Sequence, residues 1–244
     1  DMAKQWQIRR EDQDLLAYES HQKAAAAYAR GFYSDLVMPL RGLEKDNILR
    51  PDTSLEKLAT LKPAFDKRSG KGTLTAGNST NLSDGASAAL LSSEAWAQAN
   101  GKEIQAYLVD AQVAAVDFVA GEGLLMAPAW AVAQLLKRNN LKLQDFDFYE
   151  IHEAFAAQVL CTLKAWESDE FCKTKLGMDG ALGSIDRSKL NVVGSSLALG
   201  HPFAATGARI VATAAKLLKE KGQGRVLISI CTAGGMGVAA IVER

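Results

Sequence analysis

The sequence lacks an excess of either charge. Its 244 residues carry 28 lysines and arginines and 28 aspartates and glutamates, so the formal net charge is zero. This balance gives no electrostatic reason to expect nucleic acid or an anionic membrane surface as a partner. No apolar run is long enough to span a bilayer and no secretory signal is recognisable, so we expect no membrane span.

Cysteines are also scarce. Cys161, Cys172 and Cys231 are the only three, and this small odd number favours reduced thiols over a disulfide framework. We therefore expect a cytoplasmic protein, or one of the mitochondrial matrix if the source is eukaryotic. Nothing near Cys161 or Cys172 suggests reactivity, and we interpret both as core or surface thiols.

Apolar residues make up 48% of the chain, which supports a sizeable core. The length suits one large domain or two small ones. The first residue is Asp1 and a helical pattern starts at once. We therefore expect the chain to begin partway through a longer protein.

Helical and extended patterns alternate along most of the chain. We predict helices over 1–33 and near 55–61, a strand passing into a short helix over 86–99, helices from 128, over 153–166 and from 203, and a polar insertion over 167–187. We predict strands at 36–38 and 104–119, and then at 146–151, 191–196, 225–230 and 238–242. The last five strands predict an α/β fold with a mixed, mostly parallel five-stranded sheet and helices on both faces. The final two are joined by so few residues that they must form an antiparallel hairpin.

The segment Gly200–Gly207 joins one of these strands to a helix. Pro202 suits the first helical position, where no amide donor is needed, so His201 is expected just before the helix N-terminus. Backbone amides there favour a developing negative charge, and an imidazole titrates near neutral pH. These properties suit proton transfer, although a capping or core histidine is an equally ordinary interpretation of the local sequence.

Three candidate groups follow predicted strands. His152, His201 and Cys231 each lie where a strand ends, and the carboxyl ends of strands form sites in open α/β sheets. We therefore expect the three to converge at one edge. A metal site is disfavoured by the absence of close ligand spacing and of a fourth ligand. A thiol–imidazole pair, an inert buried thiol at Cys231 and coincidence remain open.

Several motifs together resemble those of the thiolases, in the same order from Met2 to the end. They are Ser20–Ala24, Leu61–Asp66, Thr73–Asn78, Ser83–Ala86, His152-Glu153-Ala154-Phe155, Gly200-His201-Pro202 with Thr206-Gly207, and Cys231–Gly237. The likeness is greatest to degradative 3-ketoacyl-CoA thiolases of the type found as the β subunit of trifunctional complexes. That type has histidine before Glu-Ala-Phe, where many thiolases have asparagine, and an insertion like 167–187.

The resemblance implies a thiolase-like fold and the cleavage of 3-ketoacyl-CoA by CoA in fatty-acid β-oxidation. It implies that His201 activates an acyl-accepting cysteine and that Cys231 carries a proton at the second centre. His201 and a water held by His152 would form one oxyanion hole, and the Ala233 amide part of the other. Thr80 would line the coenzyme A channel. No metal and no permanently bound cofactor is implied, since CoA is a substrate.

Two departures from the family pattern matter. Ala233 stands where many thiolases have glycine but keeps the amide. No segment matches the acyl-accepting cysteine, which the family carries in its N-terminal half, so we expect the 244-residue chain alone to be inactive. The resemblance divides the chain into 1–72, part of the loop domain; 73–101, the end of the N-terminal half; and 102–244, the C-terminal domain.

The resemblance also implies partners. The family forms homo-oligomers, and this type works beside a hydratase/dehydrogenase subunit. The alternative from another class is a non-catalytic CoA-binding or scaffold module of the same fold. A condensing enzyme of the ketoacyl synthase type is a third possibility, but such enzymes usually place a second histidine where Cys231 lies.

Overall fold

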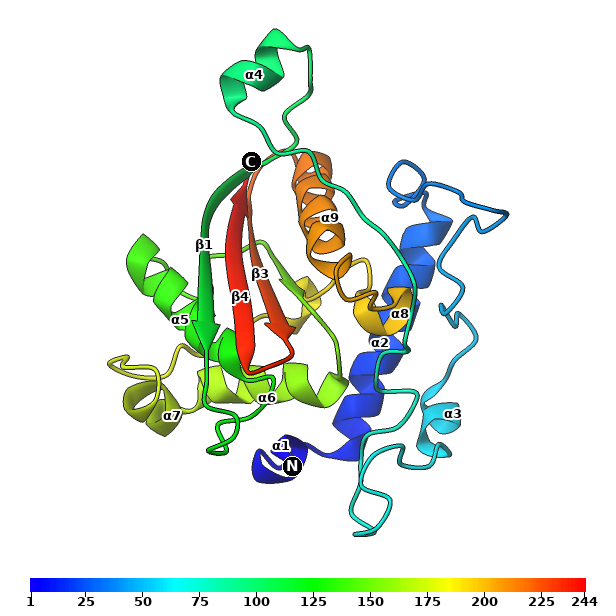
Figure 1. Ribbon diagram of the computed structural model, residues 1–244, viewed down its shortest axis with the longest axis vertical. Coiled ribbons are helices and arrows are strands. Elements are labelled where there is room, and N and C mark those ends of the chain that lie inside the picture. Colours follow the sequence, from blue (N-terminus) through cyan, green and yellow to red (C-terminus); the bar gives the residue numbers. More distant parts are fainter.

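The computed structural model describes every residue from Asp1 to Arg244 (Figure 1). The strands are β1 (Tyr107–Ala115), β2 (Phe148–Ile151), β3 (Arg225–Thr232) and β4 (Met236–Glu243). The helices are α1 (Met2–Gln5), α2 (Arg10–Ala29), α3 (Leu55–Ala59), α4 (Glu94–Ala99), α5 (Ala127–Asn139), α6 (Ala156–Glu167), α7 (Asp169–Thr174), α8 (Ser196–Leu199) and α9 (Thr206–Lys221), with a short 3-10 turn η1 (Arg187–Lys189). None of the helices combines the length and the apolar character that crossing a membrane would need.

The four strands form one mixed sheet in the order β1-β4-β3-β2. β3 and β4 form the predicted antiparallel hairpin, β1 is antiparallel to β4, and only β2 and β3 run parallel. The mixed α/β fold is therefore as predicted, but the expectation of five mostly parallel strands is wrong. One strand is missing, and most of the pairing is antiparallel.

The missing strand is the one predicted at 191–196. Only a bridge between Leu190 and Tyr149 pairs this segment with β2. Asn191 then takes a left-handed conformation (φ 46°), and its side-chain amide bonds both the N–H and the C=O of Ile151 at 2.9 Å. A side chain thus replaces the backbone of a neighbouring strand, and the chain turns away into α8.

Helices cover both faces of the sheet, as predicted. On one face, α5 and α6 contribute to the largest core, in which Leu135 and Val159 lie with Leu227 of β3. On the other face, α9 packs Ile210 and Leu218 onto the sheet. The α5 start is favoured by Pro128 in its first turn, and its end by Asn140 in the left-handed conformation.

Several other predicted boundaries differ from the structure. The helix expected over 1–33 is interrupted before Arg10, where Gln7 has a φ of 51°. The strand expected at 36–38 is absent, and so is the strand expected before the helix that ends at Ala99. The last helix begins at Thr206 rather than at 203, because the Pro202 carbonyl first accepts the amides of Ala205 and Thr206.

The segment from 73 to 93 is an extended strap that runs along α8 and α9 before reaching α4 (Figure 1). Its contacts fix the loop that carries His201. A Cβ atom on Gly85 would lie 2.7 Å from Cγ of Pro202, and Ser87 donates a hydrogen bond to the Ala205 carbonyl. The strap therefore holds the loop from outside.

The hairpin end is held against α5 by the absence of a side chain at Gly237. A Cβ atom there would lie 2.5 Å from the Pro128 nitrogen and 2.9 Å from the Ala127 carbonyl carbon. These are backbone atoms, so relief requires a shift of the helix or of the strand. The start of α5 and the end of the hairpin are fixed together in this way.

We predict that Gly237→Ala lowers the free energy of unfolding by about 2 kcal/mol through overpacking. Gly207→Ala is the matched control, since a Cβ atom there meets nothing within 4 Å and alanine suits a helix at least as well as glycine. Urea unfolding of both variants measures the difference. Equal midpoints for the two would contradict the tight contact.

Candidate functional site

Two of the predicted site residues lie together. The rings of His152 and His201 have centroids 4.1 Å apart at an angle of 51°. His152 follows β2 and its backbone N–H donates to Ser229 of β3 at 2.9 Å. His201 follows α8, and its ring also contacts that of Phe203, with centroids 4.8 Å apart. His152 thus lies at the end of a strand, as expected, whereas His201 follows the short helix α8 and not a strand.

Each ring is oriented by a hydroxyl group. His152 Nδ1 lies 2.7 Å from Ser196 Oγ at the start of α8. His201 Nδ1 lies 2.7 Å from Thr206 Oγ1 at the start of α9. The guanidinium of Arg209, one turn further along α9, donates to Ser196 Oγ at 2.8 Å. Both imidazoles are thus fixed through their Nδ1 atoms.

Both histidines are disposed to remain neutral. Burial lowers the pKa of His152 well below its usual value, and the neighbouring His201 and Arg209 act in the same direction. Burial and the positive charge of Arg209 also lower the pKa of His201. At neutral pH His201 can accept a proton, and His152 can donate a hydrogen bond without carrying charge.

A buried carboxylate holds the segment after β2 in place. Glu153 accepts hydrogen bonds from Ser20 Oγ and Asn191 Nδ2, each at 2.7 Å, and from the Leu197 amide at 3.2 Å. These groups come from α2, the turn after η1 and α8. His152 is therefore positioned by a neighbour tied to three separate segments.

Cys231 lies nearby on β3, two residues beyond Ser229. It is buried, and burial raises the pKa of its thiol to about 12. Its cross-strand partner is Gly237, and this side of the sheet packs against Pro128 at the start of α5. No hydrogen bond joins Cys231 Sγ to either imidazole, so the joint action of the thiol with the histidines stays a prediction.

Ala233 forms the exposed tip of the hairpin turn. The two residues after it, Gly234 and Gly235, have φ values of 83° and 74°, which glycine adopts without strain. At Gly235 a Cβ atom would also lie 2.6 Å from the Val116 carbonyl oxygen. The turn thus depends on glycine for its shape. The role of the Ala233 amide remains untested.

Thr80 is tied to the histidine segment. Its backbone N–H and its hydroxyl both donate to the Ala154 carbonyl, at 3.0 and 3.1 Å. Asn78 accepts the amide of Ala156, so the loop 73–81 is joined to the start of α6. The hydroxyl of Thr80 is therefore engaged within the protein, and its contact with a ligand stays a prediction.

A cavity of about 340 Å³ lies beside this loop, between α2, α3 and the chain that leads to α3. The cationic side chains of Arg50 and Lys57 and the buried His21 line it, and the hydroxyl of Ser79 is buried there without a partner. The other lining residues are Ile48, Thr53, Leu58, Leu61, Ala76, Gly77, Asn81 and Leu197.

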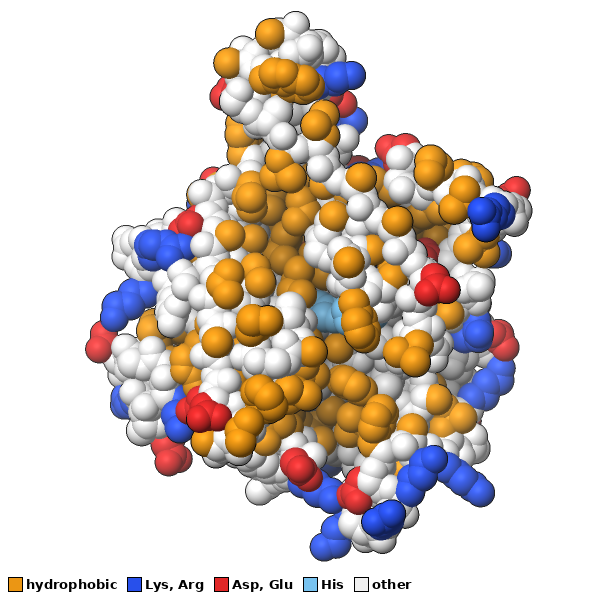
Figure 2. Space-filling view, in the orientation of Figure 1, with side chains coloured by type: hydrophobic (Ala, Val, Ile, Leu, Met, Phe, Trp, Pro, Cys, Tyr) orange, Lys and Arg blue, Asp and Glu red, His pale blue; other side chains and the backbone are white.

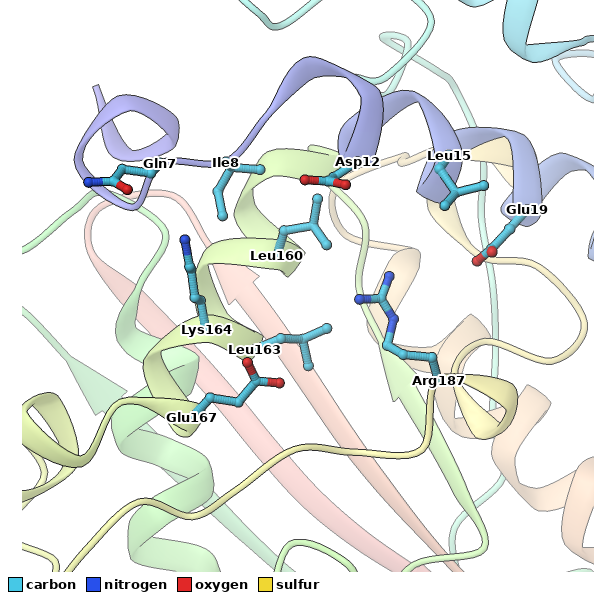
Figure 3. A pocket seen from close by; sticks show the side chains of 10 residues that line it. All are labelled: Gln7, Ile8, Asp12, Leu15, Glu19, Leu160, Leu163, Lys164, Glu167 and Arg187. Atoms are coloured by element: carbon cyan, nitrogen blue, oxygen red, sulfur yellow. The ribbon is translucent and has the colours of Figure 1, made fainter.

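A second cavity of about 420 Å³ is separate from this region. Figure 3 shows side chains from α2 and α6 pointing toward each other across it, with Arg187 of η1 at one side. Its charged residues are of both signs. Neither cavity is lined by His152, His201 or Cys231. No group of three or more histidine, cysteine or acidic side chains is placed to hold a metal ion.

Figure 2 shows histidine surface in a hollow on one face of the molecule, with hydrophobic side chains along the hollow. Of the three histidines, only His201 is not buried. An imidazole at the floor of an apolar depression suits a reaction from which bulk water is largely excluded.

Ser196, Arg209 and Glu150 are not among the residues predicted from the sequence. The two oxygens of Glu150 are buried without hydrogen-bond partners, and burial raises its pKa to about 8. The sequence does carry a signal for Glu150, because it is an acidic residue between the apolar Tyr149 and Ile151 in the predicted strand 146–151. Ser196 and Arg209 had none, since their contacts join helices through side chains.

The family model described as "Thiolase, C-terminal domain" matches residues 102–244, and the one described as "Thiolase, N-terminal domain" matches residues 1–95. The chain is similar to proteins named 3-ketoacyl-CoA thiolase from Shewanella loihica, at 45% identity, and from Serratia proteamaculans, at 46%, over 248 aligned residues. Each match covers 99% of this chain and 56% of the relative. The chain thus spans about half the length of these relatives.

A solved structure gives the same picture. The chain is similar to the crystal structure of the Bacillus anthracis acetyl-CoA acetyltransferase, with a TM-score of 0.81 and 37% sequence identity. The similarity covers 99% of this chain and 58% of that one. Its extent supports the predicted fold over the whole chain.

The buried Glu150 predicts a pH dependence of stability. Its pKa is about 8 in the folded state against an ordinary 4.5, so the folded state holds the proton more tightly than the unfolded state. Stability linked to Glu150 is therefore fully present below about pH 4.5 and is lost as the pH rises through 8. The glutamine in Glu150→Gln does not titrate. We therefore expect the free energy of unfolding of the variant, relative to that of the parent, to rise by about 3 kcal/mol between about pH 5 and pH 8.

Urea unfolding of both proteins at the two pH values measures this change. The contributions of the histidines cancel, since both proteins contain them. Glu170→Gln, an exposed substitution, should show the same difference from the parent at both pH values. A pH-independent difference for Glu150→Gln would show that this carboxyl ionises normally.

Proposed function

The chain belongs to the thiolase family, and from this premise we propose that the protein acts as an acetyl-CoA C-acyltransferase. Its substrates would be a 3-ketoacyl-CoA and CoA, and its products acetyl-CoA and a shortened acyl-CoA, as in fatty-acid β-oxidation. The observation that carries this proposal is the close contact between His152 and His201, whose lowered pKa values favour the neutral form of both rings. The names of the relatives supply the substrate class.

The proposed roles follow from what each group can do. His201 is half-buried and neutral, so it can take a proton from a thiol nucleophile. His152 is fully buried with Nε2 free of protein partners, so it can donate toward an oxyanion, directly or through a water. Cys231 is proposed to return the proton at the second centre, and the Ala233 amide to stabilise the second oxyanion.

Because its pKa is raised, the Cys231 thiol remains protonated at neutral pH, which suits a general acid better than a thiolate nucleophile. A protonated sulfhydryl can deliver its proton to a carbanion as the C–C bond breaks, and then recover one from incoming CoA. The acyl-accepting thiolate must therefore be a different group. Neither Cys161 nor Cys172 qualifies, because both are buried in or beside α6 and α7.

We propose that the 340 Å³ cavity receives part of coenzyme A, and that Thr80, which lies in the chain between the lining residues Ser79 and Asn81, contacts it. Arg50 and Lys57 suit the phosphates of CoA, and the loop 76–81 can place backbone groups against the pantetheine chain. The loop is joined to the segment of His152 through Ala154. Binding at the cavity would thus be connected to the histidines by a short path.

The wider context is proposed on the same premise. The protein would be a homo-oligomer of the cytoplasm, or of the mitochondrial matrix in a eukaryote, working with a hydratase/dehydrogenase subunit. Exposed apolar side chains support association, among them Leu82, Leu90, Val113 and Phe203. The divisions 1–72, 73–101 and 102–244 are proposed as part of a loop domain, the end of an N-terminal half and a C-terminal domain.

We predict that the 244-residue chain binds CoA and that Arg50→Ala weakens binding about tenfold, as expected for one lost charge-assisted contact. Isothermal titration with CoA measures the dissociation constants. Lys137→Ala is the control, because Lys137 is an exposed cation on α5 that lines neither cavity. Equal binding by parent and Arg50→Ala would place CoA elsewhere.

We also predict that this chain alone does not cleave acetoacetyl-CoA with CoA, because it offers no second thiol at the site. Formation of acetyl-CoA, followed by chromatography, is the measurement. The double variant His201→Ala, Cys231→Ala sets the background from contaminating enzymes. Turnover clearly above that background would overturn the proposed need for another nucleophile. Tight CoA binding by a full-length protein without such a thiol would favour the non-catalytic scaffold.

A further inference from the structure

A donor-to-acceptor chain runs from α9 to the buried histidine. Arg209 Nη2 lies 2.8 Å from Ser196 Oγ, and Ser196 Oγ lies 2.7 Å from His152 Nδ1. Ser196 and His152 are both fully buried. The roles proposed above for the reaction involve neither Ser196 nor Arg209.

The direction of each hydrogen bond in this chain follows from the first group. A guanidinium can only donate, so Ser196 Oγ accepts from Arg209. The hydroxyl of Ser196 has one proton, and His152 Nδ1 is the only other polar atom in hydrogen-bond contact with it. The serine oxygen could accept a second bond from Nδ1–H, but its buried hydroxyl proton would then have no acceptor. All these groups are satisfied when Ser196 donates to Nδ1, which places the imidazole proton on Nε2.

We propose that Ser196 and Arg209 are positioning residues that hold His152 in the tautomer with its proton on Nε2. The catalytic consequence rests on the proposed function, in which Nε2–H faces a developing oxyanion. In the other tautomer Nε2 would present a lone pair and repel that oxygen. The pair thus fixes the sign of the electrostatic field that His152 offers.

The second histidine is not constrained in the same way. The Thr206 hydroxyl, which contacts His201 Nδ1, also reaches the Pro202 carbonyl at 3.4 Å. It can donate to either acceptor, and no cation donates to it. His201 can therefore gain and lose a proton at Nε2, as a base must, while its neighbour remains a donor.

The charges around Arg209 support its fixed role. Burial raises the pKa values of the Glu150 and Glu153 carboxyl groups, and the positive charge of Arg209 acts in the opposite direction. It also lowers the pKa of His152, which disfavours the imidazolium. The arrangement keeps the ring neutral while it selects one of the two neutral forms.

The tautomer can be measured directly by long-range proton–nitrogen correlation on the uniformly ¹⁵N-labelled 244-residue protein. Only three histidines contribute, and one is an internal reference. His21 Nδ1 accepts the Arg50 amide at 3.2 Å, which requires its proton on Nε2. We expect His152 to show the same pattern as His21, with a pyridine-like Nδ1 and a pyrrole-like Nε2. A pyrrole-like Nδ1 on His152 would overturn the proposal without any variant.

Variants then test what sets the tautomer. Ser196→Ala should raise the population of the other form roughly fivefold, the ratio expected for one lost hydrogen bond. Ser195→Ala is the matched control, because Ser195 is equally buried and lies 3.5 Å from Arg209 but does not contact the ring. Unchanged His152 resonances in folded Ser196→Ala would contradict the proposal.

The role of the cation is tested separately. Arg209→Met leaves the Ser196 oxygen without a donor, which favours acceptance from Nδ1–H and should give a mixture of tautomers, whereas Arg209→Lys, which also only donates, should retain the parent pattern. Equal patterns in the two would remove Arg209 from the proposal. None of these spectra requires CoA binding or turnover, so a failure of the proposed function would leave them interpretable, and the reverse also holds.

Discussion

The carboxylate of Glu153 joins parts of the chain that are far apart in sequence. Its partners come from α2, from the turn at Asn191 and from α8, and it is fully buried. A buried carboxylate is tolerated only where its oxygens are well bonded. Here that requirement fixes the residue before it, His152, in front of α8 and α9. The ring contact with His201 and the hydrogen bond with Ser196 both depend on this placement.

Much of the fold could be predicted because its signals are local. The hairpin of β3 and β4 has two β-rich runs separated by glycines, and α5 has a proline at its start and a basic last turn. The strand expected at 191–196 failed for a reason that periodicity does not record. Val193 is buried as a strand residue would be, but the side chain of Asn191 makes the hydrogen bonds to Ile151 that a strand would have made.

The candidate site divides in the same way. His152 and His201 could be chosen from their positions at the ends of elements, and their contact is as expected. Ser196, Arg209 and the cavity beside Arg50 could not, because side-chain hydrogen bonds and cavities depend on how helices dock. The alternation of side chains along β3 turns Cys231 toward α5. A direct contact between its thiol and the two histidines therefore stays a prediction.

The contacts of Ser20 have a consequence for how this protein folds. Its hydroxyl donates to Glu153, 133 residues away, and accepts the amide of Ser195, 175 residues away. Loops of this length must close before either contact repays the entropy lost. High contact order slows folding, whereas the hairpin and α9 can form from neighbours in sequence. We therefore expect the contacts of Ser20 to form later in folding than the hairpin of β3 and β4 and than α9.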